Sequence, residues 1–549
     1  MKYIAIVECT SSGILYVDEI ISRGFKPLVV NIKAPSQDLI NYRAMLRKNL
    51  EKKVEFIDED EDYDTFVAKL RRYSIIAVFP GSESGVRLAD RLVKSLGLVG
   101  NDEATTYLRC TKEGMYEALC KANLRRIETR KVETEEDIEE FWKENDLQKC
   151  VLKFSESAGT VGLRICSGLA EAVEHFKQMK ITPDFLGKIG SEVLIQEFIS
   201  GTEYIVDTIS CDGKHMLTDV WEYRKITADD GTLAYDYVKL IKDLNPGHVD
   251  MIRYVYAVLD AVDMRWGICH CEVMIDNKGP ILIETNARPI GLAMTSTYLD
   301  EILGYHLTDI AIDTYLDPSR FDMYAHRVYD PPKYALMKLM IVPEDIVGTF
   351  APIFVLSNFI SSTREVLFFG KEGVAEYGRT IDLETSPVTI KMANENYGDL
   401  MKDYEMLRLV ESNYFHFFYE IDGEIPPVEL RTDIKKILAF VDPRWRVLVV
   451  TDDGLSVAQN GQLTDFEGWM VFDGAIYACC GKSTTKERYR SLFTAIRAIR
   501  SGGGLIIIPE SFEAIKSGSV IMEFMMNVSG VHVIAPSYDF EGLVCGLKK

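Results

Sequence analysis

Residues 267–288 read GICHCEVMIDNKGPILIETNAR, and this stretch decides the fold of the region around it. Two runs, Ile268–Ile275 and Ile281–Asn286, have the length and the apolar content of β-strands. Between them stands Asp276-Asn277-Lys278-Gly279, a sequence of turn-forming residues. The stretch therefore predicts a β-hairpin.

The predicted hairpin brings several polar side chains together. With Lys278 at its centre, Glu272 lies directly opposite Glu284, although like charges across a strand pair repel each other. Asn286 and Arg288 follow Glu284 at a spacing of two, so these three side chains leave one face of the strand. Carboxylate and amide oxygens are hard ligands that suit Mg²⁺ holding nucleotide phosphates. The alternative is an exposed acidic hairpin that binds nothing, because such turns are common.

The composition limits the classes of protein and partner. With 549 residues the chain is too long for one core, and its length suggests roughly three or four domains. A net charge of −22 argues against sequence-independent binding to nucleic acid or to an anionic membrane, which needs clustered lysine and arginine. A nucleotide needs only a local basic pocket, so nucleotide binding stays open.

Other features of the sequence indicate the cellular compartment of the protein. The N-terminal MKYIAIVEC begins directly with a strand-like run, and no apolar stretch approaches the ~20 residues of a membrane-spanning helix. Eleven cysteines are scattered without C-x-x-C pairs, which argues against a zinc site or a disulfide framework. We therefore expect a cytoplasmic protein with free thiols.

The succession of strand-like and helix-like segments predicts an α/β and α+β multidomain protein. Residues 1–104 alternate strands and helices, which predicts a doubly wound parallel sheet with helices on both faces. From 105 to 325 the pattern predicts an α+β domain with antiparallel sheets. Residues 326–428 add further strands and end near Pro426-Pro427. Residues 429–549 resume the α/β rhythm and predict an accessory domain.

Four features precede the hairpin in a fixed order. Lys112 begins a helix, and Lys153 ends a strand. The loop 155–162 is rich in small residues, whose backbone N–H groups can approach phosphate oxygens closely. The fourth feature is QEFISGTE at 196–203. Each is weak alone, because a lysine beside a glycine-rich loop is more often a surface lysine beside a turn.

The ordered set resembles the ATP-grasp superfamily over about residues 1–420. The pattern comprises Lys112, Lys153 with its loop, E-F-I-x-G-x-E at 197–203, H-x-E at 270–272 and E-x-N-x-R at 284–288. Within that superfamily, residues 80–101 and the ETNARPIG run look like the carboxylate–amine ligases that make dipeptides and related amides. The resemblance implies a pre-ATP-grasp domain at 1–104, an ATP-grasp core at 105–325 and the C-terminal part of that module at 326–428.

The resemblance also implies roles for individual residues. ATP would be bound by Lys112, Lys153, the loop residues Ser157 and Gly159, the hinge residues Glu197, Phe198 and Ile199, and Glu203 at the ribose. Mg²⁺, with Mn²⁺ as an alternative, would be held by Glu272, Glu284 and Asn286. Arg288 and Lys153 would be catalytic, since a guanidinium stabilises the spread charge of a phosphoryl group in transfer.

The implied reaction joins a carboxylate to an amine. The carboxylate attacks the γ-phosphate of ATP, giving an acyl phosphate and ADP, and the amine then displaces phosphate. His270 is a candidate base for the incoming ammonium group, and the alternative is a packed residue behind Glu272.

The substrate side of the site is less well defined. By comparison with such ligases, Glu222, Arg224 and Lys225 lie near the substrates, with Arg288 and Gly291; the alternative for 221–225 is an ordinary exposed strand end. Many relatives have a Gly-Gly pair after Asn-x-Arg, whereas this chain has Pro289-Ile290-Gly291, which leaves the substrate's identity open.

Three hypotheses therefore remain: a carboxylate–amine ligase acting on small-molecule substrates, the same activation with a carrier-protein thiol or another nucleophile as acceptor, and a non-catalytic nucleotide-binding regulator. We expect a homo-oligomer, a dimer, without nucleic-acid or membrane partners. The role of residues 429–549 stays open.

Overall fold

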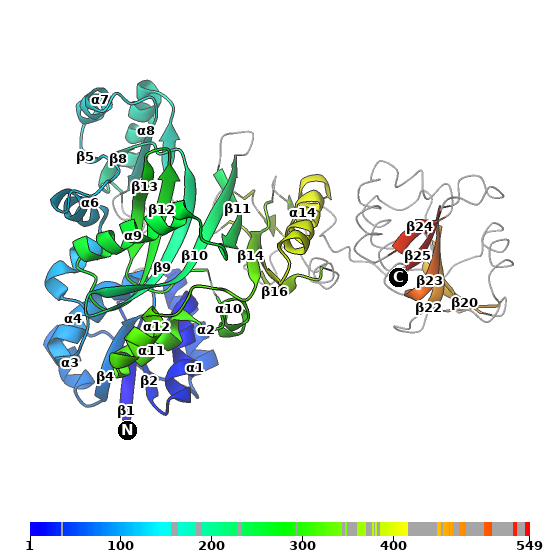
Figure 1. The fold of residues 1–549 in the computed structure, drawn as a ribbon, viewed down its shortest axis with the longest axis horizontal. Helices are drawn as coiled ribbons and strands as arrows, with labels where there is room; N and C mark the ends of the chain where they lie inside the picture. The colour runs from blue at the N-terminus through cyan, green and yellow to red at the C-terminus, as the bar shows by residue number, and fades with distance from the viewer. Residues whose placement is uncertain are drawn as a thin grey trace. The chain divides into compact units, whose positions relative to one another are not determined.

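The structure, a computed structural model, falls into two compact units (Figure 1). The first holds Met1–Leu339 with Lys391–Tyr397, and the second holds most residues from Met340 onward. The structure describes residues 1–33, 37–154, 163–182, 189–227, 233–292, 294–342, 346–347, 360–368, 376–377, 379–380, 385–414, 447–451, 454–459, 462–465, 472–478, 499–507, 531–534 and 544–548. Among these, no helix is both long enough and apolar enough to cross a membrane.

The N-terminal region forms a parallel sheet between two layers of helices. Its strands run in the order β3-β2-β1-β4, with bounds β1 Lys2–Val7, β2 Lys26–Asn31, β3 Glu55–Asp58 and β4 Ser74–Pro80. Its helices are α1 Leu15–Ser22, α2 Gln37–Leu50, α3 Tyr63–Leu70 and α4 Val86–Leu96. Ile4 and Ile6 enter one core with Tyr16 of α1. Val7 enters the opposite core with Phe66 of α3, because side chains alternate along a strand. The predicted doubly wound sheet is confirmed.

Two antiparallel sheets follow, as predicted for an α+β region. The smaller runs β5-β8-β6-β7, with β5 Thr129–Val132, β6 Cys150–Phe154, β7 Arg164–Cys166 and β8 Val193–Glu197, and is packed by α7 Glu135–Glu144 and α8 Leu169–Ile181. Within the first unit the larger runs β13-β12-β9-β10-β11-β14, with β9 Thr202–Cys211, β10 Lys214–Thr227, β11 Leu233–Leu240, β12 Gly267–Asp276, β13 Gly279–Asn286 and β14 Tyr334–Leu339.

Helices cover both faces of the larger sheet. The remaining helices of this region are α5 Thr106–Cys110, α6 Lys112–Lys121, α9 Pro246–Ala261, α10 Ser296–Leu303, α11 Leu307–Leu316 and α12 Ser319–Ala325. Val206 of β9 packs with Val255 of α9 in one core. Its neighbour Ile205 packs with Tyr298 of α10 in the other core. The sheet is therefore apolar on both faces over much of its length.

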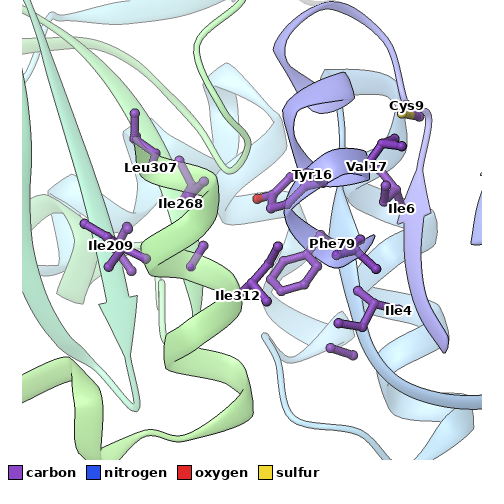
Figure 2. Close-up of a cluster of buried hydrophobic side chains, with 14 of the residues drawn as sticks. Ile4, Ile6, Cys9, Tyr16, Val17, Phe79, Ile209, Ile268, Leu307 and Ile312 are labelled. Carbon is purple, nitrogen blue, oxygen red and sulfur yellow. The ribbon is translucent and has the colours of Figure 1, made fainter. Parts of the chain in front are cut away.

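The N-terminal sheet and the larger antiparallel sheet share one hydrophobic core (Figure 2). Phe79 at the end of β4 stacks on Tyr16 with ring centroids 4.8 Å apart. Ile268 of β12 and Ile312 of α11 belong to the same cluster. This continuous apolar packing fixes the carboxyl ends of β1 and β4 against the hairpin region.

The predicted hairpin is present, and Glu272 pairs with Glu284 as expected. Its turn differs from the prediction. Asp276 pairs with Gly279, so the turn is centred between Asn277 and Lys278 rather than on Lys278. A register shift between Glu272 and Val273 then adds one residue on the β13 side, and this β-bulge restores the opposition of the two glutamates.

The second unit is described by its strands and one helix. They are β15 Ile346–Val347, β16 Thr363–Phe368, β17 Glu376–Tyr377, α14 Tyr397–Tyr414, β19 Val447–Thr451, β20 Gly454–Gln459, β21 Gln462–Asp465, β22 Phe472–Ala478, β23 Ile499–Ile507, β24 Val531–Ile534 and β25 Val544–Lys548. The strand β18 Val388–Asn394 is divided, because residues 391–394 belong to the first unit, as does Tyr397 at the start of α14. The strands from β19 onward form a mixed sheet in the order β21-β20-β19-β22-β23-β25-β24.

Replacing Gly85 by alanine tests the close packing at the end of β4. A Cβ atom at Gly85 would lie 2.3 Å from the carbonyl oxygen of Val7, so backbone must shift. We expect a loss of about 1–3 kcal/mol in the free energy of unfolding, measured by urea denaturation. At Gly168, where a Cβ meets open space, alanine should cost only about 0.5 kcal/mol. Equal stability of the Gly85 variant and the parent would contradict this account.

Candidate active site

The two facing glutamates form the acidic centre of the site. Asn286 donates a hydrogen bond from its amide nitrogen to Oε1 of Glu284 at 3.2 Å, and Nζ of Lys112 lies 3.6 Å from Oε2 of Glu284. Burial raises the pKa of Glu284, but Lys112 and Lys153 outweigh burial and hold it below its ordinary value. Glu284 is therefore an ionised carboxylate at neutral pH.

Two lysines face these carboxylates from other elements. Lys112 is the first residue of α6, which begins where the side chain of Thr111 accepts a hydrogen bond from the backbone of Gly114. Lys153 is buried on β6. Burial and the charge of Lys112 lower the pKa of Lys153 to about 7, although Glu284 opposes them. Bound phosphate oxygens would raise the pKa of Lys153 again, because they add negative charge beside its ammonium group.

His270 is held between two carboxylates and lies on the same sheet face as Glu272. Its Nδ1 lies 2.8 Å from Oδ1 of the buried Asp207, and its Nε2 lies 3.5 Å from Oε1 of Glu272. Burial lowers the pKa of His270, but Asp207 and Glu272 outweigh it and raise the pKa to about 9. The imidazole is therefore charged at neutral pH, which favours the packed, orienting role over that of a base.

Asp207 is itself supported by a second buried acid. Asp219 is its direct partner on β10, and Trp221 donates to Oδ1 of Asp219 at 2.5 Å. Burial raises the pKa of Asp219 well above its ordinary value, and the charge of Asp207 raises it further. Burial and the neighbouring carboxylate of Asp207 thus both disfavour ionisation of Asp219.

Arg288 lies next to an acidic residue from the N-terminal sheet. Its Nε is 3.3 Å from Oε2 of Glu83, which follows β4 in the short 3₁₀ helix η2 (Glu83–Gly85). Burial raises the pKa of Glu83, and the charge of Arg288 opposes that rise. Gly291 accepts a hydrogen bond at its carbonyl oxygen from the hydroxyl of Ser11, at 2.5 Å. The segments that follow β1 and β4 thus both contact residues 288–291.

The side chains of Glu203 and of residues 222–225 do not all point to the same face of the sheet. Glu203 accepts a hydrogen bond from Nζ of Lys225 at 2.8 Å, on the face that carries Glu272. Glu222 instead pairs with Lys239 at 3.4 Å, and Nε of Arg224 lies 3.8 Å from Asp236. Alternation along β10 puts Glu222 and Arg224 on the opposite face from Lys225.

The predicted hinge follows the end of β8. Oε1 of Glu197 accepts a hydrogen bond from the backbone N–H of Glu128 at 3.0 Å, and Nζ of Lys149 lies 5.6 Å from the centre of the Phe198 ring. Ile199 continues the same segment. Ser157 and Gly159 lie outside the described residues.

The donor set fits a hard divalent cation. The described residues contain no group of three or more histidine, cysteine, aspartate or glutamate side chains arranged to hold a metal. Two facing carboxylates and the amide of Asn286 supply a partial set of oxygen ligands, and Mg²⁺ commonly completes such a set with phosphate oxygens and water. Glu272, Glu284 and Asn286 would thus hold the ion.

Two residues of the site have no counterpart among the sequence predictions. Glu83 stands in the quoted run 80–101, but its neighbour Arg288 is 205 positions away in the chain. In the sequence, Asp207 is a single polar residue in an apolar strand. Its role in the site becomes visible only from its pairing with His270. A buried acid inside a strand is the one signal that could have indicated it.

Replacing Asp207 by asparagine tests the charge on His270. The pKa of His270 in the fold, about 9, exceeds its ordinary 6.5, so its stabilising contribution is complete below pH 6.5 and is lost as the pH rises to 9. We expect the stability difference between parent and variant to shrink over that range, measured by urea denaturation at each pH. Taking the difference cancels the titration of Lys153 in the same range.

Asp260→Asn provides the control, because Asp260 lies 3.3 Å from Nε2 of His215 in a separate histidine–carboxylate pair. Its stability difference from the parent should not follow the titration of His270. If the stability difference between the parent and the Asp207 variant did not depend on pH, Asp207 would not be what raises the pKa of His270.

Comparison with known proteins adds independent findings. Residues 147–297 match the family model described as the ATP-grasp domain. The chain is 28% identical over 373 residues to dapdiamide A synthase of Enterobacter agglomerans, covering 66% of this chain and 85% of that protein. It is 25% identical over 177 residues to carnosine synthase 1 of Homo sapiens, covering 30% of this chain and 20% of that protein.

Solved structures share the fold. The L-amino acid ligase from Bacillus licheniformis aligns with a TM-score of 0.55 at 15% identity, covering 74% of this chain and 97% of that chain. An ADP complex of N5-carboxyaminoimidazole ribonucleotide synthetase aligns with a TM-score of 0.54 at 14% identity, covering 74% and 96%. Residues 147–297 of this chain thus match the ATP-grasp domain, and the resemblance to the ATP-grasp superfamily is confirmed.

Proposed function

We propose that this protein is an ATP-dependent ligase that activates a carboxylate as an acyl phosphate and joins it to an amine, releasing ADP and phosphate. One observation carries the proposal: ionised Glu284 faces Glu272 across the hairpin while Lys112 and Lys153 approach from other elements. Such a site suits a polyphosphate bound with a divalent cation. The similarity to an L-amino acid ligase and to two synthases supports the amide-forming class.

The residues of the chain would divide the first step among them. Lys112 and Lys153 bind and neutralise phosphate oxygens. Glu203 accepts hydrogen bonds from the ribose once Lys225 gives up its hydrogen bond to Glu203. Mg²⁺ bound by the hairpin carboxylates would supply charge neutralisation for phosphoryl transfer. Arg288 orients the attacking carboxylate or the phosphoryl group, because a guanidinium matches two oxygens at once.

The second step needs a dry site and a neutral amine. An acyl phosphate reacts with water as well as with the amine, so closure of the site decides the yield of amide. The incoming ammonium group must lose a proton before it attacks. His270 is already charged at neutral pH, so it serves as a fixed cation behind Glu272 rather than as the acceptor of that proton.

A product screen tests the reaction class. We expect ADP and phosphate to form when ATP, Mg²⁺ and a suitable carboxylate–amine pair are present, with a product whose mass equals both substrates less one water. Mass spectrometry over pairs of amino acids and small carboxylic acids measures this, and EDTA should abolish it. ADP release that depends on a thiol carrier would favour the alternative acceptor. Absence of ADP from every pair and acceptor would favour a nucleotide-binding regulator.

Glu284→Gln tests the acidic centre. The change keeps the shape of the side chain but removes the charge that faces Lys112, so we expect ADP formation to fall by about 100-fold or more. Thermal unfolding should show that the variant is folded. Glu55→Gln, on the edge strand β3 and hydrogen-bonded to Tyr3, is the matched control and should keep full activity. Retained turnover in the Glu284 variant would remove the metal assignment.

A further inference from the structure

The N-terminal sheet has a ligand-binding position that the proposed reaction has not yet used. Its strand order is β3-β2-β1-β4, so the chain leaves β1 toward one side of the sheet and β4 lies on the other. In open parallel sheets, ligands bind outside the carboxyl ends of the strands where the order reverses. Here that position is the pair of segments after β1 and β4, at residues 8–14 and 80–85.

Close backbone contacts hold these two segments rigidly. A Cβ atom on Gly13 would lie 2.4 Å from the carbonyl oxygen of Gly81, and one on Gly81 would lie 2.4 Å from that of Glu8. The N–H of Gly81 donates to the carbonyl of Val7 at 2.7 Å. Glu83 therefore begins its 3₁₀ turn from a fixed backbone, as a binding group needs.

Both segments face the end of the hairpin. Ser11 donates to the carbonyl oxygen of Gly291, and the N–H of Met294 donates to the hydroxyl of Ser12 at 3.3 Å. These bonds align the N-terminal loops with the chain that follows Asn286. They bring Glu83 and Arg288 together at 3.3 Å.

Glu83 has an unused acceptor in this arrangement. Its Oε2 atom is buried and accepts no hydrogen bond among the described residues, because the approach of Arg288 has ion-pair distance without hydrogen-bond geometry. Arg288, Glu284 and Lys112 are all close enough to influence its charge. The Glu83 side chain is otherwise 42% exposed, so this acceptor is within reach of a ligand that supplies a donor.

A carboxylate beside a guanidinium matches both charged groups of an amino acid. The carboxylate of an amino acid suits Arg288, whose charge also acts on Glu284, and its ammonium group suits Glu83. We propose that Glu83 binds the ammonium group of the amino acid whose carboxylate is activated. This inference rests on the proposed function and adds a specificity residue from the N-terminal sheet.

Glu83→Gln, with Glu103→Gln as control, tests the assignment. Glu103 is a half-exposed residue of the same region that pairs with Lys94 at 3.1 Å. Activation is followed as hydroxamate formed when hydroxylamine traps the acyl phosphate, with each amino acid compared with its des-amino acid. We expect Glu83→Gln to raise KM for the amino acid by about 10- to 100-fold, while KM for ATP and the control stay unchanged. Its discrimination against the des-amino acid should fall by the same factor.

Two results would overturn the assignment. One is an unchanged preference for amino acids in the Glu83 variant. The other is normal hydroxamate formation combined with slow amide formation, which would make Glu83 a group acting on the second amine.

A binding measurement separates this inference from the reaction class. If the parent protein activates no acid, the proposed function fails, and calorimetry with ADP, Mg²⁺ and the same acid pairs then decides. Amino acids that bind the parent more tightly than their des-amino acids, and lose that advantage in Glu83→Gln, would still support the assignment. Equal binding of both acids, or of neither, would refute it.

Discussion

The repulsion between Glu272 and Glu284 is the constraint on which the rest of the site depends. Two carboxylates paired across neighbouring strands are stable only where positive charge surrounds them. The chain supplies that charge from a helix start at Lys112, from a strand at Lys153 and from the imidazolium of His270. Three separate elements are therefore held by one electrostatic requirement, and a nucleotide with its cation would satisfy it more fully.

The same requirement explains the buried polar residues behind the hairpin. A charged histidine in an apolar sheet needs an ionised partner, and Asp207 provides it. Asp207 in turn lies beside Asp219, whose pKa is raised by burial and by the charge of Asp207. The acidic centre is thus oriented by buried groups that lie beside it on the same sheet face, as is common where a ligand must be held in one geometry.

The sequence was informative wherever the signal was local or ordered along the chain. Strand alternation predicted the parallel sheet, and the ordered motifs predicted the ATP-grasp domain. The Glu272–Glu284 pairing was predicted from a symmetric turn, yet it arises from a two-residue turn compensated by a bulge, which no composition rule reveals. Because side chains alternate between the two faces along a strand, the sequence could have predicted that Glu222 and Arg224 lie on the opposite face from Lys225. The contact of Glu83 with Arg288 depends on tertiary packing and has no local signal.

The core shared by the N-terminal sheet and the antiparallel sheet affects how this protein can change (Figure 2). Ile4 and Phe79 pack with Ile268 and Ile312 in one cluster, so one apolar face of the N-terminal sheet is completed by residues of the antiparallel region. The N-terminal sheet is therefore not a detachable module, and exchanging it for that of a relative would expose or overfill this cluster. The residues that we propose to select a substrate and to hold the nucleotide are consequently coupled through one core.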